Sequence, residues 1–193
     1  MTARTVVSAG GAAPVLETER LLLRGQRLDD LGRHAEMLGD PQVMRFVGGK
    51  SLSREEAWRR LIGCAGLWPI LGYGYWSLER KSDGIYLGQV GFGDFKRELS
   101  PPIENTLEMG WLLIADAHGQ GVASEAVAAA IHWAERAFPA LEITAIIAPD
   151  NAPSIRVAEK AGFVRGEETA YHGEPILIFR RSVTSVQPIR LRS

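Results

Sequence analysis

Two glycines, Gly119 and Gly121, stand one residue apart where the apolar run 111–114 gives way to a long helical pattern. The first backbone amides of a helix lack intrahelical partners and the helix dipole is positive there, so phosphate oxygens bind well at this end. Glycine removes the side chains that would block their approach. The spacing therefore predicts a phosphate-binding turn, with an ordinary tight turn as the alternative.

Two common phosphate loops are excluded by the residues of this turn. A Walker loop needs Gly-Lys followed by Ser or Thr, which the turn lacks. A dinucleotide fingerprint needs a third Gly or Ala where Ser124 stands, and it needs a strand near the start of the domain. A generic α/β phosphate binder remains, and it predicts that the protein binds a nucleotide.

Hydrophobic periodicity predicts the elements that position the turn. Strands over 73–78, 86–95 and 106–114 are expected to form an antiparallel meander. From 122 to 138 the period becomes helical, and the apolar run 143–148 predicts a strand parallel to the third one. The other expected elements are a strand at 20–24, a helix from Asp29 or Asp30 to about Leu38, a helix from the Ser53–Glu56 capping box to near Leu67 or Pro69, a helix from Asn151 to Gly162, and strands at 163–171 and 175–181.

Composition predicts one domain and excludes several classes of protein. The 193 residues, 46% of them hydrophobic, suffice for a single domain at 15–182 between flexible tails at 1–14 and 183–193. A formal net charge of -1 leaves no global basic field for nucleic acid or for an anionic membrane. No secretory signal or membrane-spanning run is expected. The single cysteine, Cys64, excludes an internal disulfide and a multi-cysteine metal site, and it predicts a cytoplasmic protein.

Four motifs stand in order along the chain. They are Leu-Glu-Met-Gly-Trp-Leu-Leu at 107–113, His-Gly-Gln-Gly-Val-Ala-Ser-Glu-Ala at 118–126, Asn-Ala-Pro-Ser at 151–154 and Glu-Lys-Ala-Gly-Phe at 159–163. Together they resemble the GNAT N-acetyltransferase superfamily, in the branch of the ribosomal-protein N-terminal alanine and serine acetyltransferases. The resemblance covers about residues 16–181, and the opening segment 16–24 is typical of that branch. It implies an α/β (α+β) fold with a mixed, mostly antiparallel sheet of about six to seven strands, a parallel central pair and flanking helices.

The resemblance implies acetyl-CoA as cosubstrate and no metal. The family's pyrophosphate signature is Arg or Gln, two residues, Gly, one residue, then Gly or Ala. Gly121 and Ala123 match it, whereas His118 stands in the first place. His118 is expected either to make coenzyme binding weaker or pH-sensitive, or to be a turn residue with no role. The expected coenzyme-binding residues are Trp111, Leu112, Leu113, His118, Gly119, Gln120, Gly121, Val122, Ala123, Ser124, Asn151 and Ser154.

Acetyl transfer to an amine requires a base, an oxyanion donor and an acid. An α-amine, with a pKa of about 8, or a lysine, with a pKa of about 10, arrives protonated, so a base must remove a proton directly or through water. The resemblance implies Glu108 as that base, the alternative being a strand carboxylate that faces water or pairs with an arginine. The oxyanion needs a preset donor, and the resemblance implies a backbone amide within 111–113. Ser154 matches the serine that protonates the coenzyme A thiolate in this branch, and support of its own helix is the alternative.

The acceptor is expected to be a small-molecule amine or a peptide or protein N-terminus. Transfer is expected to be direct, because Cys64 has no histidine close in sequence and is expected to be inert. We place Trp68, Tyr73, Tyr75 and Tyr171 around the acceptor, with burial in the core as the alternative. The hairpin at 171–176 departs from the Tyr-Gly-Asp pattern usual in the ribosomal-protein branch. A non-catalytic acyl-CoA-binding regulatory module is the alternative function, and a monomer or a homodimer is expected.

Overall fold

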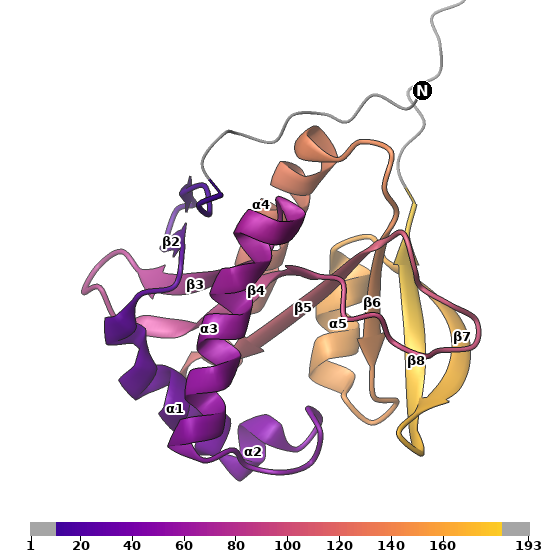
Figure 1. Cartoon of the computed structure of the whole chain (residues 1–193), viewed down its shortest axis with the longest axis horizontal. Coiled ribbons are helices and arrows are strands. Elements are labelled where there is room, and N and C mark those ends of the chain that lie inside the picture. Colours follow the sequence, from indigo (N-terminus) through magenta and orange to yellow (C-terminus); the bar gives the residue numbers. More distant parts are fainter. Residues whose placement is uncertain (1–10, 183–193) are drawn as a thin grey trace, which may run out of the picture.

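The computed structural model describes residues 11–182, whose helices flank one sheet (Figure 1). The strands are β1 (Leu16–Glu17), β2 (Leu21–Arg24), β3 (Tyr75–Arg80), β4 (Tyr86–Gly93), β5 (Leu107–Leu113), β6 (Ile143–Ile147), β7 (Val164–Tyr171) and β8 (Glu174–Arg181). The helices are α1 (Leu31–Gly39), α2 (Pro41–Met44), α3 (Arg54–Leu71), α4 (Val122–Ala137) and α5 (Ala152–Lys160), with 3-10 turns η1 (Leu28–Asp30) and η2 (Ala115–Ala117).

The strands follow the order β1-β2-β3-β4-β5-β6-β8-β7 in the sheet. The β5–β6 pair is parallel and every other recorded pair is antiparallel. This confirms the mixed, mostly antiparallel fold, the meander β3–β4–β5 and the crossover through α4. The sheet has eight strands, where six to seven were expected, because Leu16 and Glu17 pair with β2 as a short additional strand.

Helix α3 extends further than the sequence indicated. Its capping box forms as predicted, but the helix runs through Pro69 and ends at Leu71, not near Leu67 or Pro69. The last turn is held by Trp68, whose side chain is buried, and by Gly72, whose amide donates to the Trp68 carbonyl from a left-handed conformation. The packing of this turn compensates for the hydrogen bond that a proline removes.

An aromatic cluster joins α3 and α4 to the sheet. Trp76 of β3 meets Trp68 of α3 and Trp133 of α4 edge-on, with ring centroids 4.7 and 5.1 Å away. Tyr73 packs against Phe138, just beyond α4, at 5.4 Å. Edge-to-face pairs of this kind add to the free energy gained by burying the rings. The cluster therefore fixes where α4, and with it the glycine turn at its start, lies on the sheet.

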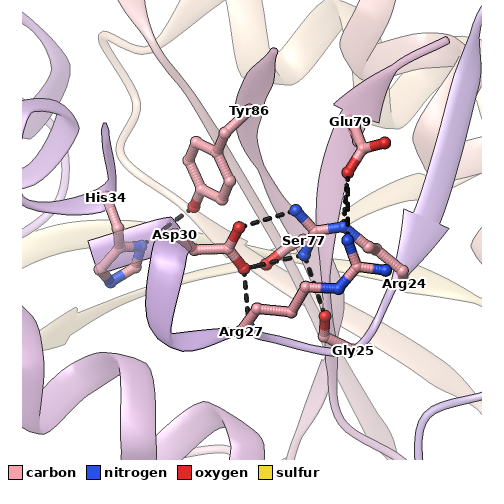
Figure 2. A network of polar contacts seen from close by, with 8 residues as sticks. All are labelled: Arg24, Gly25, Arg27, Asp30, His34, Ser77, Glu79 and Tyr86. Carbon is pink, nitrogen blue, oxygen red and sulfur yellow. Dashed lines mark hydrogen bonds and ion pairs between the residues drawn. The ribbon is translucent and has the colours of Figure 1, made fainter. Parts of the chain in front are cut away.

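A buried ion pair ties β2 to the turn before α1 (Figure 2). Arg24 donates to both carboxylate oxygens of Asp30, at 2.9 and 2.7 Å, and its Nε donates to Glu79 at 2.6 Å. The Ser77 hydroxyl and the Arg27 amide also donate to Asp30. Although burial opposes its charge, these donors hold the pKa of Asp30 below its ordinary value. The carboxylate therefore turns inward, and it does not cap α1 with its side chain as the sequence predicted.

His34 of α1 lies beside this network and is fully buried (Figure 2). Its Nδ1 is 3.0 Å from the Tyr86 hydroxyl, and its Nε2 has no hydrogen-bond partner among residues 11–182. Burial and the positive charge of Arg60 lower the pKa of His34 from 6.5 to about 4, against the opposing effect of Asp30. The folded protein therefore holds the imidazole neutral at pH 7.

We expect His34 to make the protein less stable in acid. Above pH 6.5 the imidazole is neutral in the folded and unfolded chains, and below it the unfolded chain takes up a proton that the folded chain refuses until about pH 4. The free energy of unfolding should therefore fall by about 2 kcal/mol between pH 7.0 and 4.5 on this account. Urea unfolding at both pH values, for the natural protein and for His34→Gln, measures it. Equal losses in the two proteins would contradict the prediction.

The ends of the described chain bear on the predicted tails. Residues 11–14 were expected in the N-terminal tail, but Ala13 packs against the core and the Pro14 carbonyl accepts a 2.7 Å hydrogen bond from the Trp76 indole. The rest of that tail, 1–10, and the C-terminal tail, 183–193, lie outside the described residues. Within 11–182, none of the helices has the length and apolarity needed to cross a membrane.

Candidate active site

Strands β5 and β6 pair at their starts and then diverge. Within the described chain, their pairing joins only Leu107 to Ile143 and Glu108 to Thr144, although β5 continues to Leu113. The later residues of β5 therefore keep a row of backbone groups on the β6 side that no described strand pairs with. This divergence lies next to the glycine turn, because β5 leads through η2 into that turn.

The alternation of a strand identifies which amides face the divergence. The Ile114 amide donates to a carbonyl at the start of β4, whereas the Leu107 amide donates toward β6. Successive amides along a strand point to opposite edges. Those of Trp111 and Leu113 therefore face the divergence, and that of Leu112 faces β4. Two of the three residues expected to supply an oxyanion donor are oriented for that role.

The glycine turn has the geometry that the sequence indicated. Gly119 and Gly121 have φ values of 72° and 76°, which side chains rarely adopt. A Cβ on Gly119 would meet nothing within 4 Å, so the backbone conformation rather than crowding requires glycine there. The first bond of α4 runs from the Glu125 amide to the Gly121 carbonyl, at 3.1 Å. The amides of residues 122–124 are thus left without helical partners.

Thr18 and Arg20 brace this turn from the connection between β1 and β2, and sequence reasoning missed this role. Arg20 Nε donates to one oxygen of Glu125 at 2.7 Å, and its Nη1 donates to the Gln120 carbonyl at 2.9 Å. The Thr18 hydroxyl and the Arg20 amide donate to the other oxygen of Glu125. Although burial acts in the opposite direction, these donors lower the pKa of Glu125. The first turn of α4 is therefore fixed to the sheet.

His118 and Gln120 stabilise the turn from within. The Nε2 of His118 lies 3.1 Å from the Leu113 carbonyl oxygen, to which a protonated Nε2 donates. The Gln120 side-chain amide donates to the Asp116 carbonyl at 2.5 Å. This geometry agrees with His118 as a turn residue. It also leaves the imidazole exposed beside the amides at the start of α4.

The start of α5 carries the predicted cap and the candidate acid. Asn151 Oδ1 accepts a 3.2 Å hydrogen bond from the Ser154 amide, which confirms the expected N-cap. The Ser154 side chain is half-buried, and its hydroxyl forms no hydrogen bond with any residue in 11–182. A hydroxyl in this state is free to donate to a ligand placed beyond the end of β6.

Glu108, the candidate base, forms an ion pair with Arg97, a residue that sequence reasoning missed. The Arg97 Nε lies 2.8 Å from both carboxylate oxygens, and its Nη2 lies 2.8 Å from one of them. Glu108 is 7% exposed. Burial disfavours the charge of Arg97, but the hydrogen bonds and charge of Glu108 raise its pKa. This is the arginine pairing expected as the alternative to a catalytic role, and Arg97 gave no signal because it stands in a connection without a motif.

Aromatic rings enclose the Arg97 guanidinium. Its central carbon lies 4.9 Å from the ring centroid of Phe95 and 4.8 Å from that of Tyr171. Tyr75 is buried next to Phe95, with ring centroids 6.4 Å apart, and its hydroxyl occupies the space above Gly110 of β5. Burial raises the pKa of the Tyr75 hydroxyl, so it stays protonated. Tyr75 and Tyr171, both predicted near the acceptor, are thus gathered with the candidate base around Arg97.

A depression opens to solvent beside this cluster. It is shallow and is lined by Arg97, Glu108 and Phe95 and by the carboxylates Asp94 and Glu104. Glu108 lies in the middle of the sheet there, because its backbone pairs with Gly93 of β4 on one side and with Thr144 of β6 on the other.

Trp68 and Tyr73 lie away from this depression, in the aromatic cluster described above. Their exposed fractions are 4% and 9%, and the Trp68 indole donates to the Tyr75 carbonyl at 2.9 Å. Their positions agree with burial in the core. Cys64 is buried as well, and burial raises the pKa of its thiol to about 11, so little thiolate forms at neutral pH. Residues 11–182 contain no cluster of His, Cys, Asp or Glu side chains suited to a metal ion.

The chain is similar to known acetyltransferases over most of its length. Residues 20–164 match the family model described as an acetyltransferase (GNAT) domain. The uncharacterized protein YkkB of Bacillus subtilis (strain 168) is 31% identical over 86% of this chain and 94% of its own. A putative GNAT-family acetyltransferase from Bordetella pertussis superposes with a TM-score of 0.77 at 29% identity, over 88% of this chain and all of that one. RimL, a ribosomal L7/L12 α-N-protein acetyltransferase solved with coenzyme A, has the same fold at a TM-score of 0.72 and 17% identity, over 88% of this chain and 98% of that one.

Proposed function

This chain belongs to the GNAT family of acetyl-CoA-dependent acetyltransferases, and on that basis we propose that it transfers acetyl directly to a primary amine in a ternary complex. The observation that carries the proposal is the glycine turn. Free amides and the positive end of α4 meet there, beside the divergence of β5 from β6. If the diphosphate of the coenzyme binds at the turn, its thioester arm can lie along the unpaired edge of β5.

The turn fits the diphosphate of coenzyme A by charge and by shape. The amides of residues 122–124 act as donors, and the side-chain-free Gly119 and Gly121 allow the phosphates to approach. The Arg20 guanidinium, paired with Glu125, lies 3.5 Å from the position that a Cβ on Gly121 would take. We assign coenzyme binding to this turn, to the β5 edge and to Asn151 at the start of α5.

The chemistry uses two positions on β5 and one on α5. Glu108 takes the proton of the acceptor ammonium, directly or through water, and the freed amine attacks the thioester carbonyl carbon. The Trp111 or Leu113 amide stabilises the oxyanion of the tetrahedral intermediate. As the C–S bond breaks, the Ser154 hydroxyl donates a proton to the departing thiolate. The nitrogen of the intermediate releases its extra proton in the same step, and that proton restores the Ser154 hydroxyl through water. No acyl-enzyme is formed, which fits the buried Cys64.

Tyr75 and Tyr171 are proposed to line the acceptor site, because both lie in the cluster around Glu108. Trp68 and Tyr73 are left out of the proposed site because their rings pack in the core. A small-molecule amine and a peptide or protein N-terminus both remain acceptor classes for this site. The hairpin of β7 and β8 carries Tyr171 at the end of β7 into the proposed acceptor site. We propose that this hairpin selects between the two acceptor classes.

Thermal unfolding with acetyl-CoA tests the proposal. A ligand at 100 times its dissociation constant adds about 2.7 kcal/mol, which for a domain of this size raises the melting temperature by roughly 5 to 10 °C. ATP and NAD at equal concentration serve as controls. A shift with acetyl-CoA alone supports the assignment, and release of the coenzyme A thiol with a panel of amines then tests transfer. A shift with the nucleotides instead would indicate a generic phosphate binder, and binding without transfer to any amine would favour a non-catalytic module.

A further inference from the structure

Arg97 occupies a complete cation-binding site. A carboxylate engages its guanidinium through three contacts of 2.8 Å, and two aromatic rings lie within 5 Å of its central carbon. A carboxylate with aromatic faces is the combination that recognises organic cations. The side chain that fills this site is 19% exposed, so the site opens to solvent on one side.

Two walls of the site, Glu108 and Tyr171, lie on the sheet, whereas its occupant and the third wall, Phe95, are loop side chains. Glu108 sits in the middle of the sheet, paired with Gly93 of β4 and Thr144 of β6. Tyr171 ends β7, where it pairs with Glu174 of β8. Arg97 comes from the connection 94–106 between β4 and β5 and reaches the site through a flexible side chain. It can therefore leave the site while Glu108 and Tyr171 stay in place.

The connection is anchored beyond Arg97, so the side chain can leave without the loop. Leu99 and Ile103 are buried against Ile176 and Ile178 of β8. The Thr169 hydroxyl donates to the carbonyl of residue 100 at 2.7 Å. Substitution of Arg97 therefore leaves this anchor intact, and the variant is expected to fold.

The guanidinium stands where an ammonium would pair with Glu108. Both carboxylate oxygens of Glu108 accept hydrogen bonds from Arg97, so an amine must compete with the guanidinium for them. Once Arg97 has left, the carboxylates of Asp94, Glu104 and Glu108 line the depression against the single ammonium of Lys96. The vacated site then attracts a cation and repels an anion.

We propose that the acceptor binds as an alkylammonium in the place of the Arg97 guanidinium, between Glu108 and Tyr171, so that Arg97 is an internal competitor of the acceptor. This deepens the proposed function and rests on it for the identity of the ligand as an acceptor. Protonated alkylamines are the acceptor class that the site selects. Arylamines of similar shape, which carry no charge at pH 7, are selected against.

Binding of benzylammonium in the absence of acetyl-CoA tests this proposal. We expect calorimetry at pH 7 to give about tenfold tighter binding to Arg97→Ala than to the natural protein, a gain of about 1.4 kcal/mol. Aniline, matched in shape but uncharged, should show no such gain. The double variant Arg97→Ala/Glu108→Gln should lose this gain, because it lacks the carboxylate that would pair with the ammonium.

Two further variants complete the test. Arg97→Met keeps the aliphatic contacts with the rings and should show the same gain if Arg97→Ala is poorly folded. Arg165→Ala removes an exposed arginine of β7 that pairs with Glu168, and it controls for the change in net charge. Equal affinity of the natural protein and both Arg97 variants, or an equal gain for aniline, would overturn the proposal. Because no acetyl-CoA is present, this outcome is separate from any failure of acetyl-CoA to bind.

Discussion

Gly121→Asp is expected to weaken acetyl-CoA binding by at least about 100-fold. The substitution places a carboxylate against the proposed diphosphate site, and two like charges about 4 Å apart repel by about 4 kcal/mol at the effective dielectric of a protein surface. The φ of 76° at this position adds strain of about 1 to 2 kcal/mol for any side chain. The dissociation constant of acetyl-CoA, measured by calorimetry, checks the prediction.

Two control variants separate charge from backbone strain. Gly121→Ala carries the strain without the charge and should weaken binding by less than the aspartate does. Gly48→Asp places the same carboxylate at a φ of 82° in open space after α2, and it should leave the dissociation constant unchanged. If the affinity of Gly121→Asp equals that of the natural protein, the diphosphate does not lie at this turn.

Glu108→Gln is expected to lower turnover by about a hundredfold or more while acetyl-CoA affinity stays the same. A general base contributes about 10² to 10⁴ in rate, and glutamine cannot take the acceptor's proton. The coenzyme's proposed contacts lie further along β5 and at the glycine turn, so they are unaffected. Steady-state rates with the best amine of the acceptor panel, together with calorimetry of acetyl-CoA, separate the two quantities.

The matched control for Glu108→Gln is Glu142→Gln. Glu142 also forms a partly buried pair with an arginine, Arg180, at 2.9 Å, so its substitution tests the cost of breaking an arginine–glutamate pair away from the proposed site. Turnover of this control should remain close to that of the natural protein. Unchanged turnover in Glu108→Gln would remove Glu108 from the mechanism, and the ion pair with Arg97 would then be its role.

The fold and the glycine turn could be predicted because their signals are local. A change from alternating to helical period marks where β5 gives way to α4, and Gly119 and Gly121 stand at that junction whatever the rest of the chain does. Asn151 is likewise a cap that is visible within four residues. These features depend on neighbouring residues and on general backbone geometry.

The environment of the site could not be predicted because it depends on distant residues. Glu125 and Arg20 are 105 positions apart, and only the paired β2 and the docked α4 bring them together. Trp68 and Tyr75 lie seven positions apart and are both aromatic. Trp68 nevertheless packs against other tryptophans, whereas Tyr75 lies beside the candidate base. Residue type and spacing do not distinguish such positions, because the packing of α3 decides which ring lies in the core.

The brace between the β1–β2 turn and the first turn of α4 also bears on how the domain folds. A contact between residues 20 and 125 closes a long loop, and long-range contacts of this kind cost more chain entropy and slow folding compared with local ones. Helix α4 can form from local sequence, whereas the attachment of its first turn to the sheet needs a partner 105 positions away. The seating of the glycine turn on the sheet therefore depends on a contact that only the folded domain makes.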